Sequence, residues 1–100
     1  MRLGILVTTD RHLRQIRGIT QAAIGKGHAV TIFATDTGTK LLADDSFAAL
    51  GALPGVTMSN CAHSAQRYGG RPAGLPGVIA SGSQFENAVM VSEADKTIVL

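Results

Sequence analysis

The apolar positions of the chain follow two patterns that alternate along its length. Short continuous apolar runs are typical of strands buried on both faces of a parallel sheet, whereas apolar residues three or four apart are typical of amphipathic helices. A continuous run predicts a strand at 3–7, and further strands are predicted at 28–34, 56–60, 78–80 and 97–100. The helical spacing predicts a helix at 13–24 that Gly25, Lys26 and Gly27 end, and further helices are predicted within 39–53, at 61–68 and at 83–93.

Polar residues and glycines mark the ends of these predicted elements. The segment from Thr8 to Asp10 is a loop and helix-cap signal before the first helix. Asp44 and Asp45 are expected to begin the helix within 39–53. Ser83 and Glu86 have the spacing of a capping box at the start of the last helix. The segment from Arg71 to Gly77 is rich in proline and glycine and is predicted to be a loop.

The order of the predicted elements is βαβαβαβαβ, which indicates an α/β fold. Strands that alternate with helices form a parallel sheet covered on both faces, with right-handed crossovers. Ligands and reactive groups in such sheets lie at the carboxyl ends of the strands. The loops at this edge are expected to begin at Thr8, Ala34, Asn60 and Ser81. The chain of 100 residues is long enough for one domain over 1–100.

Composition excludes several classes of function. A single cysteine excludes a disulfide framework within the chain, and neither it nor the three histidines has the spacing of a metal site. No glycine-rich nucleotide motif follows the first strand, so no cofactor is expected. The net charge of +2 is too small to indicate nucleic acid, and no apolar run is long enough to span a membrane. Without a secretory pattern at the amino terminus, the expected compartment is the cytoplasm.

The distribution of charge draws attention to Cys61. Between Ser46 and Phe85 the only charged residues are Arg67 and Arg71, and the charges of the remaining residues cancel. Cys61 lies where the third predicted strand gives way to a helix. The partial positive charge and free N–H groups of a helix amino terminus lower the pKa of a thiol there. The alternative is that Cys61 is a small buried apolar residue, as free cysteines often are.

Four neighbours of Cys61 are candidates to support a reactive thiolate. Asn60 is expected to cap the helix, and Arg67 is expected to add positive potential. His63 is the partner of a conceivable Cys–His pair, but side chains two apart on a helix do not face each other, and a polar surface position accounts for it better. Cys61 is therefore expected to meet Ser64 or Ala65 instead.

Two glycines that follow the short helix complete the candidate site. Gly69 and Gly70 are expected to let the next loop move over the thiol. Backbone amides near Gly70 also offer a place to hold an anion.

The sequence resembles the DsrE-like family, which includes the sulfur-relay subunits related to TusD. The segment Met1 to Thr8 is similar to the family's opening strand, and Gly27-His28-Ala29-Val30 to its entry into the second strand. Residues 56–69 resemble the strand, cysteine and helix of the family, with Cys61 followed by small residues and an Arg-x-Gly ending. Residues 77–82 and 87–100 resemble its closing strand, helix and strand.

The resemblance implies a three-layer α/β/α sandwich with a five-stranded, mainly parallel sheet. It also implies a sulfur carrier or sulfurtransferase in which Cys61 accepts sulfane sulfur as a persulfide and passes it to a partner thiol. The implied partners are donor and acceptor proteins that carry thiols or persulfides, together with further copies of the chain in a dimer, trimer or hexamer. Phe85, Val89 and Met90 are candidates for a subunit contact.

Two other functions remain open at this stage. The chain is a non-enzymatic oligomeric binding or regulatory module if Cys61 only packs or helps to bind an anion. It is a thiol redox sensor if peroxide converts Cys61 to a sulfenic acid or to a disulfide between subunits.

Overall fold

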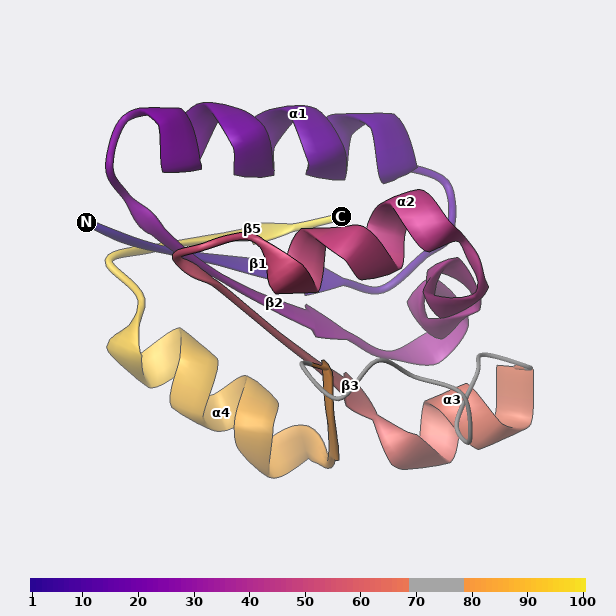
Figure 1. Cartoon of the computed structure of the whole chain (residues 1–100). Coiled ribbons are helices and arrows are strands. Elements are labelled where there is room, and N and C mark those ends of the chain that lie inside the picture. The colour runs from indigo at the N-terminus through magenta and orange to yellow at the C-terminus, as the bar shows by residue number, and fades with distance from the viewer. Residues whose placement is uncertain (69–78) are drawn as a thin grey trace.

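The computed structural model describes residues 1–68 and 79–100, which form a parallel sheet with helices on both faces (Figure 1). The strands are β1 (Arg2–Val7), β2 (Ala29–Ala34), β3 (Val56–Cys61), β4 (Ile79–Gly82) and β5 (Lys96–Val99). They lie in the order β4-β3-β2-β1-β5, and every neighbouring pair is parallel. The α/β/α architecture predicted from the sequence is confirmed.

The helices are distributed between the two faces according to the direction of each crossover. They are α1 (Leu13–Gly25), α2 (Asp45–Ala48), α3 (Ala62–Tyr68) and α4 (Gln84–Glu93), with 3-10 helices η1 (Asp36–Ala43) and η2 (Ala49–Ala52) on either side of α2. The chain steps from β1 to β2 to β3 in one direction, so right-handed crossovers place α1 and α2 on the same face. It then returns across the sheet from β4 to β5, and α4 lies on the opposite face (Figure 1).

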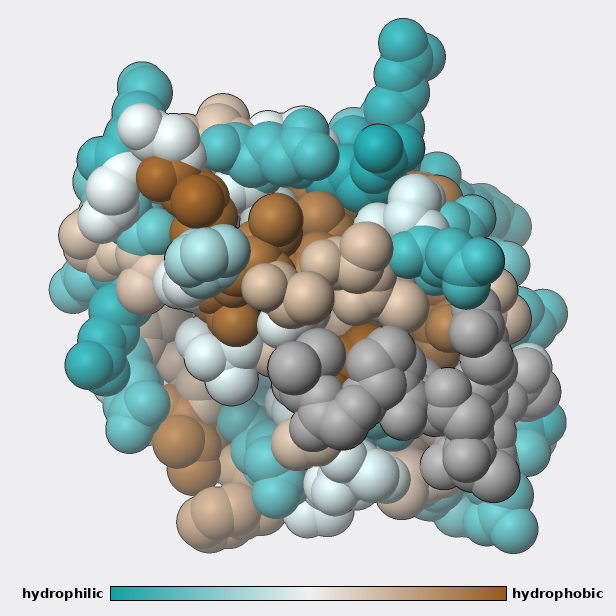
Figure 2. All heavy atoms as spheres, viewed as in Figure 1, coloured by the Kyte–Doolittle hydropathy of each residue, from teal (hydrophilic) through white to brown (hydrophobic). Residues whose placement is uncertain are grey.

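The main core lies between the sheet and the α1 face. Strand register aligns Ile98, Ile5, Ile32, Met58 and Ile79 in one row across the sheet. The three central members of this row are fully buried. In Figure 2, apolar atoms also reach the surface between α1 and α2, where the edge of this core is partly open to solvent.

The core on the α4 face is smaller. Phe33, Cys61 and Met90 are buried together there, with Leu6 packed against them. Gly4 of β1 lets α4 approach closely, because a Cβ at this position would lie 3.2 Å from the Cβ of Ala94 and from the Cγ of Met90. The helix packs mainly on β1 and β2.

Several predicted boundaries were wrong. Asp10 and its neighbours do not cap the first helix, whose N-cap residue is His12, without a side-chain cap bond. The region within 39–53 is not one helix, since η1, α2 and η2 follow one another through it. The first of these helices begins before the predicted range, at Asp36, whose φ of 49° turns the chain. Asp44 does cap α2, since its side chain accepts a hydrogen bond from the Ser46 N–H at 2.8 Å.

The predicted loop at 71–77 and residue Val78 lie outside the described residues. Within residues 1–68 and 79–100, no helix is long and apolar enough to cross a membrane.

Candidate functional site

Cys61 is the last residue of β3, and its thiol lies at the carboxyl edge of the sheet on the α4 face. The helix that was expected to begin at Cys61 begins one residue later, at Ala62. The Cys61 side chain is 8% exposed and packs with Phe33 and Met90. It is a free cysteine, in the place where an α/β sheet usually carries its reactive groups.

Hydrogen bonds to the sulfur favour its ionised form. Burial by itself raises the pKa of Cys61, because a thiolate loses hydration in an apolar environment. The backbone N–H and the hydroxyl of Ser64, the backbone N–H of His63 and the side chain of Gln84 act in the other direction. Together these donors outweigh burial and place the pKa of Cys61 below its ordinary value of 9.0.

A small polar network holds the donors in place. The Thr35 and Ser64 hydroxyls lie 3.4 Å apart, and Gln84 Nε2 donates to Thr35 Oγ1 at 3.0 Å. Thr39 Oγ1 donates to the Ser64 carbonyl at 3.2 Å. The network therefore joins the segment after β2, the helix after β3 and the helix after β4 around one thiol.

Sequence reasoning missed Thr35 and Gln84. The available signal was position, because Thr35 follows the predicted end of the second strand and Gln84 opens the helix after the fourth. Both lie at the edge where loops were expected to converge. Nothing in the spacing of these residues indicated that the Gln84 amide would reach the sulfur.

The structure brings Ser64 to Cys61, but it gives the other predicted neighbours different roles. The His63 side chain is exposed, and this residue reaches the sulfur only through its backbone N–H. Arg67 is also exposed, and its guanidinium carbon lies 5.5 Å from the centroid of the Tyr68 ring. Among the described residues, Arg67 does not contribute to the pKa shift of Cys61. Gly69, Gly70 and Arg71 lie outside the described residues.

Asn60 does not cap the helix, which corrects the sequence prediction. Because β3 continues through Cys61, alternation along the strand turns Asn60 toward the opposite face. Its side chain is fully buried, and Nδ2 donates to the Ala80 carbonyl at 3.2 Å. Asn60 Oδ1 is buried without a hydrogen-bond partner among the described residues. Asn60 thus links β3 to β4 and makes no contribution to the thiol.

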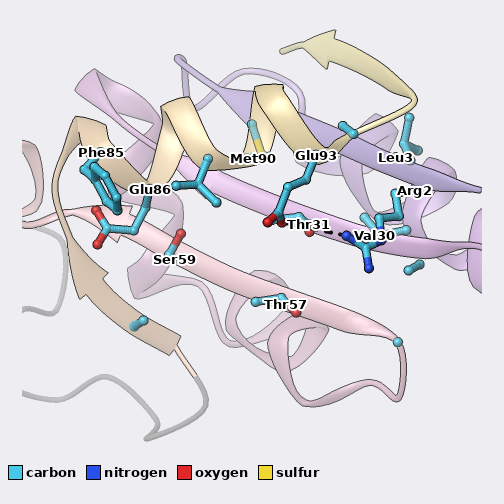
Figure 3. A pocket seen from close by; sticks show the side chains of 15 residues that line it. Arg2, Leu3, Val30, Thr31, Thr57, Ser59, Phe85, Glu86, Met90 and Glu93 are labelled. Atoms are coloured by element: carbon cyan, nitrogen blue, oxygen red, sulfur yellow. Dashed lines mark ion pairs between the residues drawn. The ribbon is translucent and has the colours of Figure 1, made fainter.

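A groove runs along the same face of the sheet as Cys61. It has a volume of about 520 Å³ and lies between α4 and the exposed parts of β2, β3 and β4 (Figure 3). Thr31, Thr57 and Ser59 lie on its floor, and Phe85, Val89 and Met90 come from α4. We call this feature the α4 groove. It approaches the thiol site, because Met90 lines the groove and also packs against Cys61.

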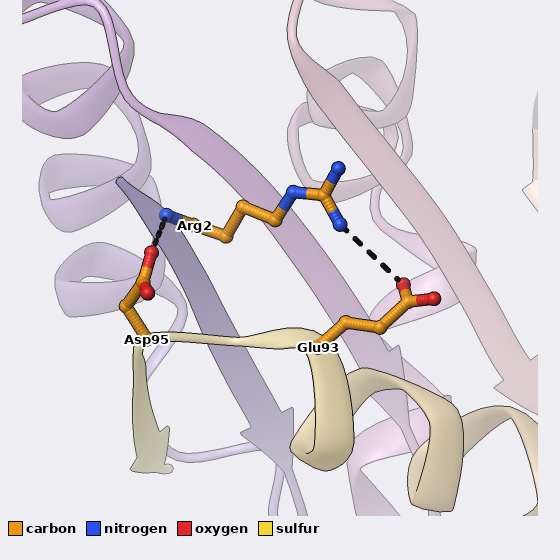
Figure 4. Close-up of polar contacts among 3 residues, drawn as sticks. All are labelled: Arg2, Glu93 and Asp95. Atoms are coloured by element: carbon orange, nitrogen blue, oxygen red, sulfur yellow. Dashed lines mark hydrogen bonds and ion pairs between the residues drawn. The ribbon is translucent and has the colours of Figure 1, made fainter.

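Charged groups lie at both ends of the α4 groove. At one end Arg2 Nη1 lies 3.8 Å from Glu93 Oε2, and the Arg2 backbone N–H donates to Asp95 Oδ2 at 2.7 Å (Figure 4). At the other end is Glu86, whose carboxylate accepts a hydrogen bond from the Ser83 backbone N–H at 2.6 Å. Within the described residues, no cluster of histidine, cysteine and acidic side chains could hold a metal ion.

Comparison with known proteins identifies the fold. No protein-family model matches the sequence, and no curated protein matches it significantly. The solved ychN protein from E. coli superimposes with a TM-score of 0.75 at 13% identity, with complete coverage of both chains. MTH1491, a protein of unknown function from Methanobacterium thermoautotrophicum, has a TM-score of 0.77 at 13% identity, with coverage of 99% of this chain and 98% of its own. These similarities support the DsrE-like α/β fold predicted from the sequence.

Proposed function

We propose that this protein is a sulfur carrier that accepts sulfane sulfur as a persulfide on Cys61 and passes it to a partner thiol. The proposal rests on the hydrogen bonds to the Cys61 sulfur from Ser64, His63 and Gln84, which lower the pKa of the thiol. The thiolate is the nucleophilic form of cysteine, so these donors favour attack on an electrophilic sulfur. The resemblance to the DsrE-like family also points to Cys61 as the residue that accepts sulfur, since the matching cysteine does so in the relay members of that family.

The transfer needs no cofactor and no second cysteine in the chain. The Cys61 thiolate attacks the outer sulfur of a donor persulfide, and a new S–S bond forms. The donor's S–S bond breaks, and its electron pair leaves with the donor cysteine sulfur as a thiolate. In the second step an acceptor thiolate attacks the outer sulfur on Cys61, and Cys61 leaves as a thiolate. Atoms and electrons balance in each step.

The surroundings of Cys61 suit a persulfide as well as a thiolate. Both are anionic sulfur species, and the N–H and O–H donors at this site stabilise negative charge on sulfur. Phe33 and Met90 cover the sulfur from the apolar side and limit its exposure to water. This low exposure would slow the loss of the bound sulfur to solution and favour transfer inside a complex with a partner.

The direct test is capture of one sulfur atom. The reduced protein is incubated with a small-molecule persulfide donor, and its intact mass is measured before and after treatment with a reductant. We expect a mass increase of one sulfur atom that the reductant reverses and that Cys61→Ser abolishes. A thiol acceptor should remove the sulfur in the same assay. If the wild-type protein gains no sulfur while its thiol is alkylated readily, the carrier proposal is wrong.

The packing of Cys61 favours a second candidate function. A cysteine that is 8% exposed among Phe33, Met90 and Leu6 has the environment of an inert structural residue. In that case the protein acts as a binding or regulatory module, and the α4 groove is its functional surface. An ordinary thiol pKa in the folded protein would favour this candidate over the sulfur carrier.

A further inference from the structure

We propose that the α4 groove binds a short zwitterionic peptide of about three residues, with the peptide's amino group at Glu86 and its carboxylate at Arg2. This inference does not depend on the sulfur chemistry of Cys61, and it names a class of ligand for the binding module described above. It rests on a buried hydroxyl without a partner on the floor of the groove, on two further hydroxyls beside it, and on opposite charges at the two ends.

Ser59 supplies the buried polar group on the floor of the groove. The residue is 7% exposed, and its side chain points from β3 toward α4 (Figure 3). Its hydroxyl has no hydrogen-bond partner among residues 1–68 and 79–100. A hydroxyl that is withdrawn from water in this way is normally satisfied by another polar group. Ser59 therefore marks a point at which a bound molecule gains a hydrogen bond.

Two threonines extend the polar floor on either side of the gap between β2 and β3. Thr31 and Thr57 are partners in the strand register, and both line the groove. Thr57 and Ser59 are two positions apart on β3, so their side chains share a face of the sheet. A hydroxyl both donates and accepts, which suits the alternating N–H and C=O groups of a peptide backbone. Val89 and Met90 form an apolar wall against which small side chains can pack.

The two ends of the groove offer an acceptor for an ammonium group and donors for a carboxylate. Both hydrogen bonds from Ser83 go to Glu86 Oε2, so Oε1 keeps its capacity to accept. Among the described residues, no basic side chain forms an ion pair with Glu86. At the other end Arg2 contacts Glu93 only through Nη1, at 3.8 Å. A guanidinium has five N–H donors, so Arg2 can bind a ligand carboxylate as well.

The separation of the two ends sets the length of the ligand. Glu86 and Glu93 are two helical turns apart, which corresponds to about 10.5 Å along α4. An extended peptide covers about 3.3–3.6 Å per residue, so three residues span this distance. A dicarboxylate would be repelled by Glu86, and a diamine would bring a second cation beside Arg2. The charges therefore favour a zwitterion over either of these ligands.

The first experiment uses trialanine as the probe and wild-type protein labelled with nitrogen-15. We expect saturable changes in the amide signals of Thr57 and Ser59 during titration. N-acetyl-trialanine and trialanine amide each lack one charge and should bind about fivefold more weakly or worse. No binding of trialanine, equal binding of the three peptides, or tighter binding of the diamine putrescine would overturn the proposal. The titration is repeated with Cys61→Ser, so its outcome is independent of the sulfur-carrier proposal.

The second experiment assigns each end of the peptide to its residue. Arg2→Gln should weaken the binding of trialanine but not that of trialanine amide, because the amide already lacks the carboxylate. Glu86→Gln should weaken the binding of trialanine but not that of N-acetyl-trialanine, which already lacks the ammonium group. Circular dichroism confirms that each variant is folded, since Glu86 also belongs to the capping box of α4. The reverse pattern would contradict the proposed orientation.

The floor of the groove is tested with a pair of serines. Ser59→Ala removes the unpartnered hydroxyl and should raise the dissociation constant of trialanine about threefold or more. Ser92→Ala is the matched control, because Ser92 is exposed on α4 and does not line the groove. This variant should bind trialanine as the wild type does. Equal affinities of the two variants would show that the peptide does not lie over Ser59.

Discussion

Gln84 and Thr35 are 49 positions apart in the chain, and a hydrogen bond of 3.0 Å joins Nε2 of the first to Oγ1 of the second. The same side chain is one of the groups that lower the pKa of Cys61. A side-chain amide has two N–H donors, so one can be held by Thr35 while the other is directed at the thiol. Thr35 is thus a positioning residue for a donor that comes from the first residue of α4. The pKa of Cys61, at the end of β3, therefore depends on the position of α4.

Substitution of Ser64 should change the ionisation of Cys61. Its hydroxyl is one of the donors that lower the thiol pKa, so Ser64→Ala should raise that pKa toward the ordinary value of 9.0. The rate of alkylation by iodoacetamide, measured as a function of pH, reports the thiolate fraction. Its midpoint should therefore move to higher pH in the variant.

The control for this prediction is His63→Ala. His63 bonds to the sulfur only through its backbone N–H, which alanine retains, and its side chain is exposed. The alkylation midpoint of this variant should match that of the wild type. A large shift in His63→Ala together with no shift in Ser64→Ala would indicate a Cys–His pair and contradict the site described above.

Two substitutions of Gln84 should separate hydrogen bonding from charge. Gln84→Ala removes a donor and should raise the Cys61 pKa. Gln84→Glu removes the same donor and adds a negative charge beside the sulfur, so it should raise the pKa further. The ultraviolet absorbance of the thiolate during a pH titration gives both values. Equal midpoints in the two variants would show that the residue 84 side chain does not face the sulfur in solution.

The sequence is sufficient to predict the layers of the fold because its central strands β1 and β2 are largely apolar runs. Ile5 and Ile32 lie within such runs, and the structure aligns them in the central row of the core. The location of Cys61 at the carboxyl edge also follows from the pattern, since glycine and polar residues mark where strands end. The strand order β4-β3-β2-β1-β5 does not follow, because each crossover is compatible with several neighbours.

The details of the site depend on information that local pattern lacks. Because β3 includes Cys61, Asn60 lies inside the strand with its side chain on the face opposite the thiol, so its expected role as a cap is lost. The effect of Gln84 on Cys61 depends on where the first turn of α4 lies on the sheet, because Gln84 is the first residue of that helix. Three short helices lie between Asp36 and Ala52, where one helix was predicted. In two of them a glycine packs closely on the sheet, Gly38 against Val7 and Gly51 against Met58 and Ile79. Helical spacing alone does not reveal these contacts.

Two glycines should respond to alanine in opposite directions. A Cβ at Gly38 would collide with the backbone carbonyl of Val7, which is held in the sheet. Gly38→Ala should therefore lower the free energy of unfolding by about 1–3 kcal/mol. Gly18 is exposed within α1 and has open space around it, so Gly18→Ala should raise stability by about 0.5–1 kcal/mol. Urea denaturation of both variants checks the pair, and a stabilised Gly38→Ala protein would refute the close approach.

Acid should weaken the start of α4 through Glu86. Hydrogen bonds from Ser83, chiefly from its backbone N–H, hold the pKa of this carboxyl below its ordinary value of 4.5. Its ionisation therefore contributes stability that is fully present above pH 4.5 and is lost as the pH falls through the lower, folded-state pKa. Glu86→Gln keeps a capping-box residue but cannot ionise, so this part of the pH dependence should disappear. The free energy of unfolding in urea is measured for the wild type and Glu86→Gln between neutral pH and pH 3. Asp44 also has a lowered pKa, but it is present in both proteins, so its contribution cancels when the two are compared. Parallel curves of unfolding free energy against pH would mean that the Glu86 carboxylate gains nothing from the cap.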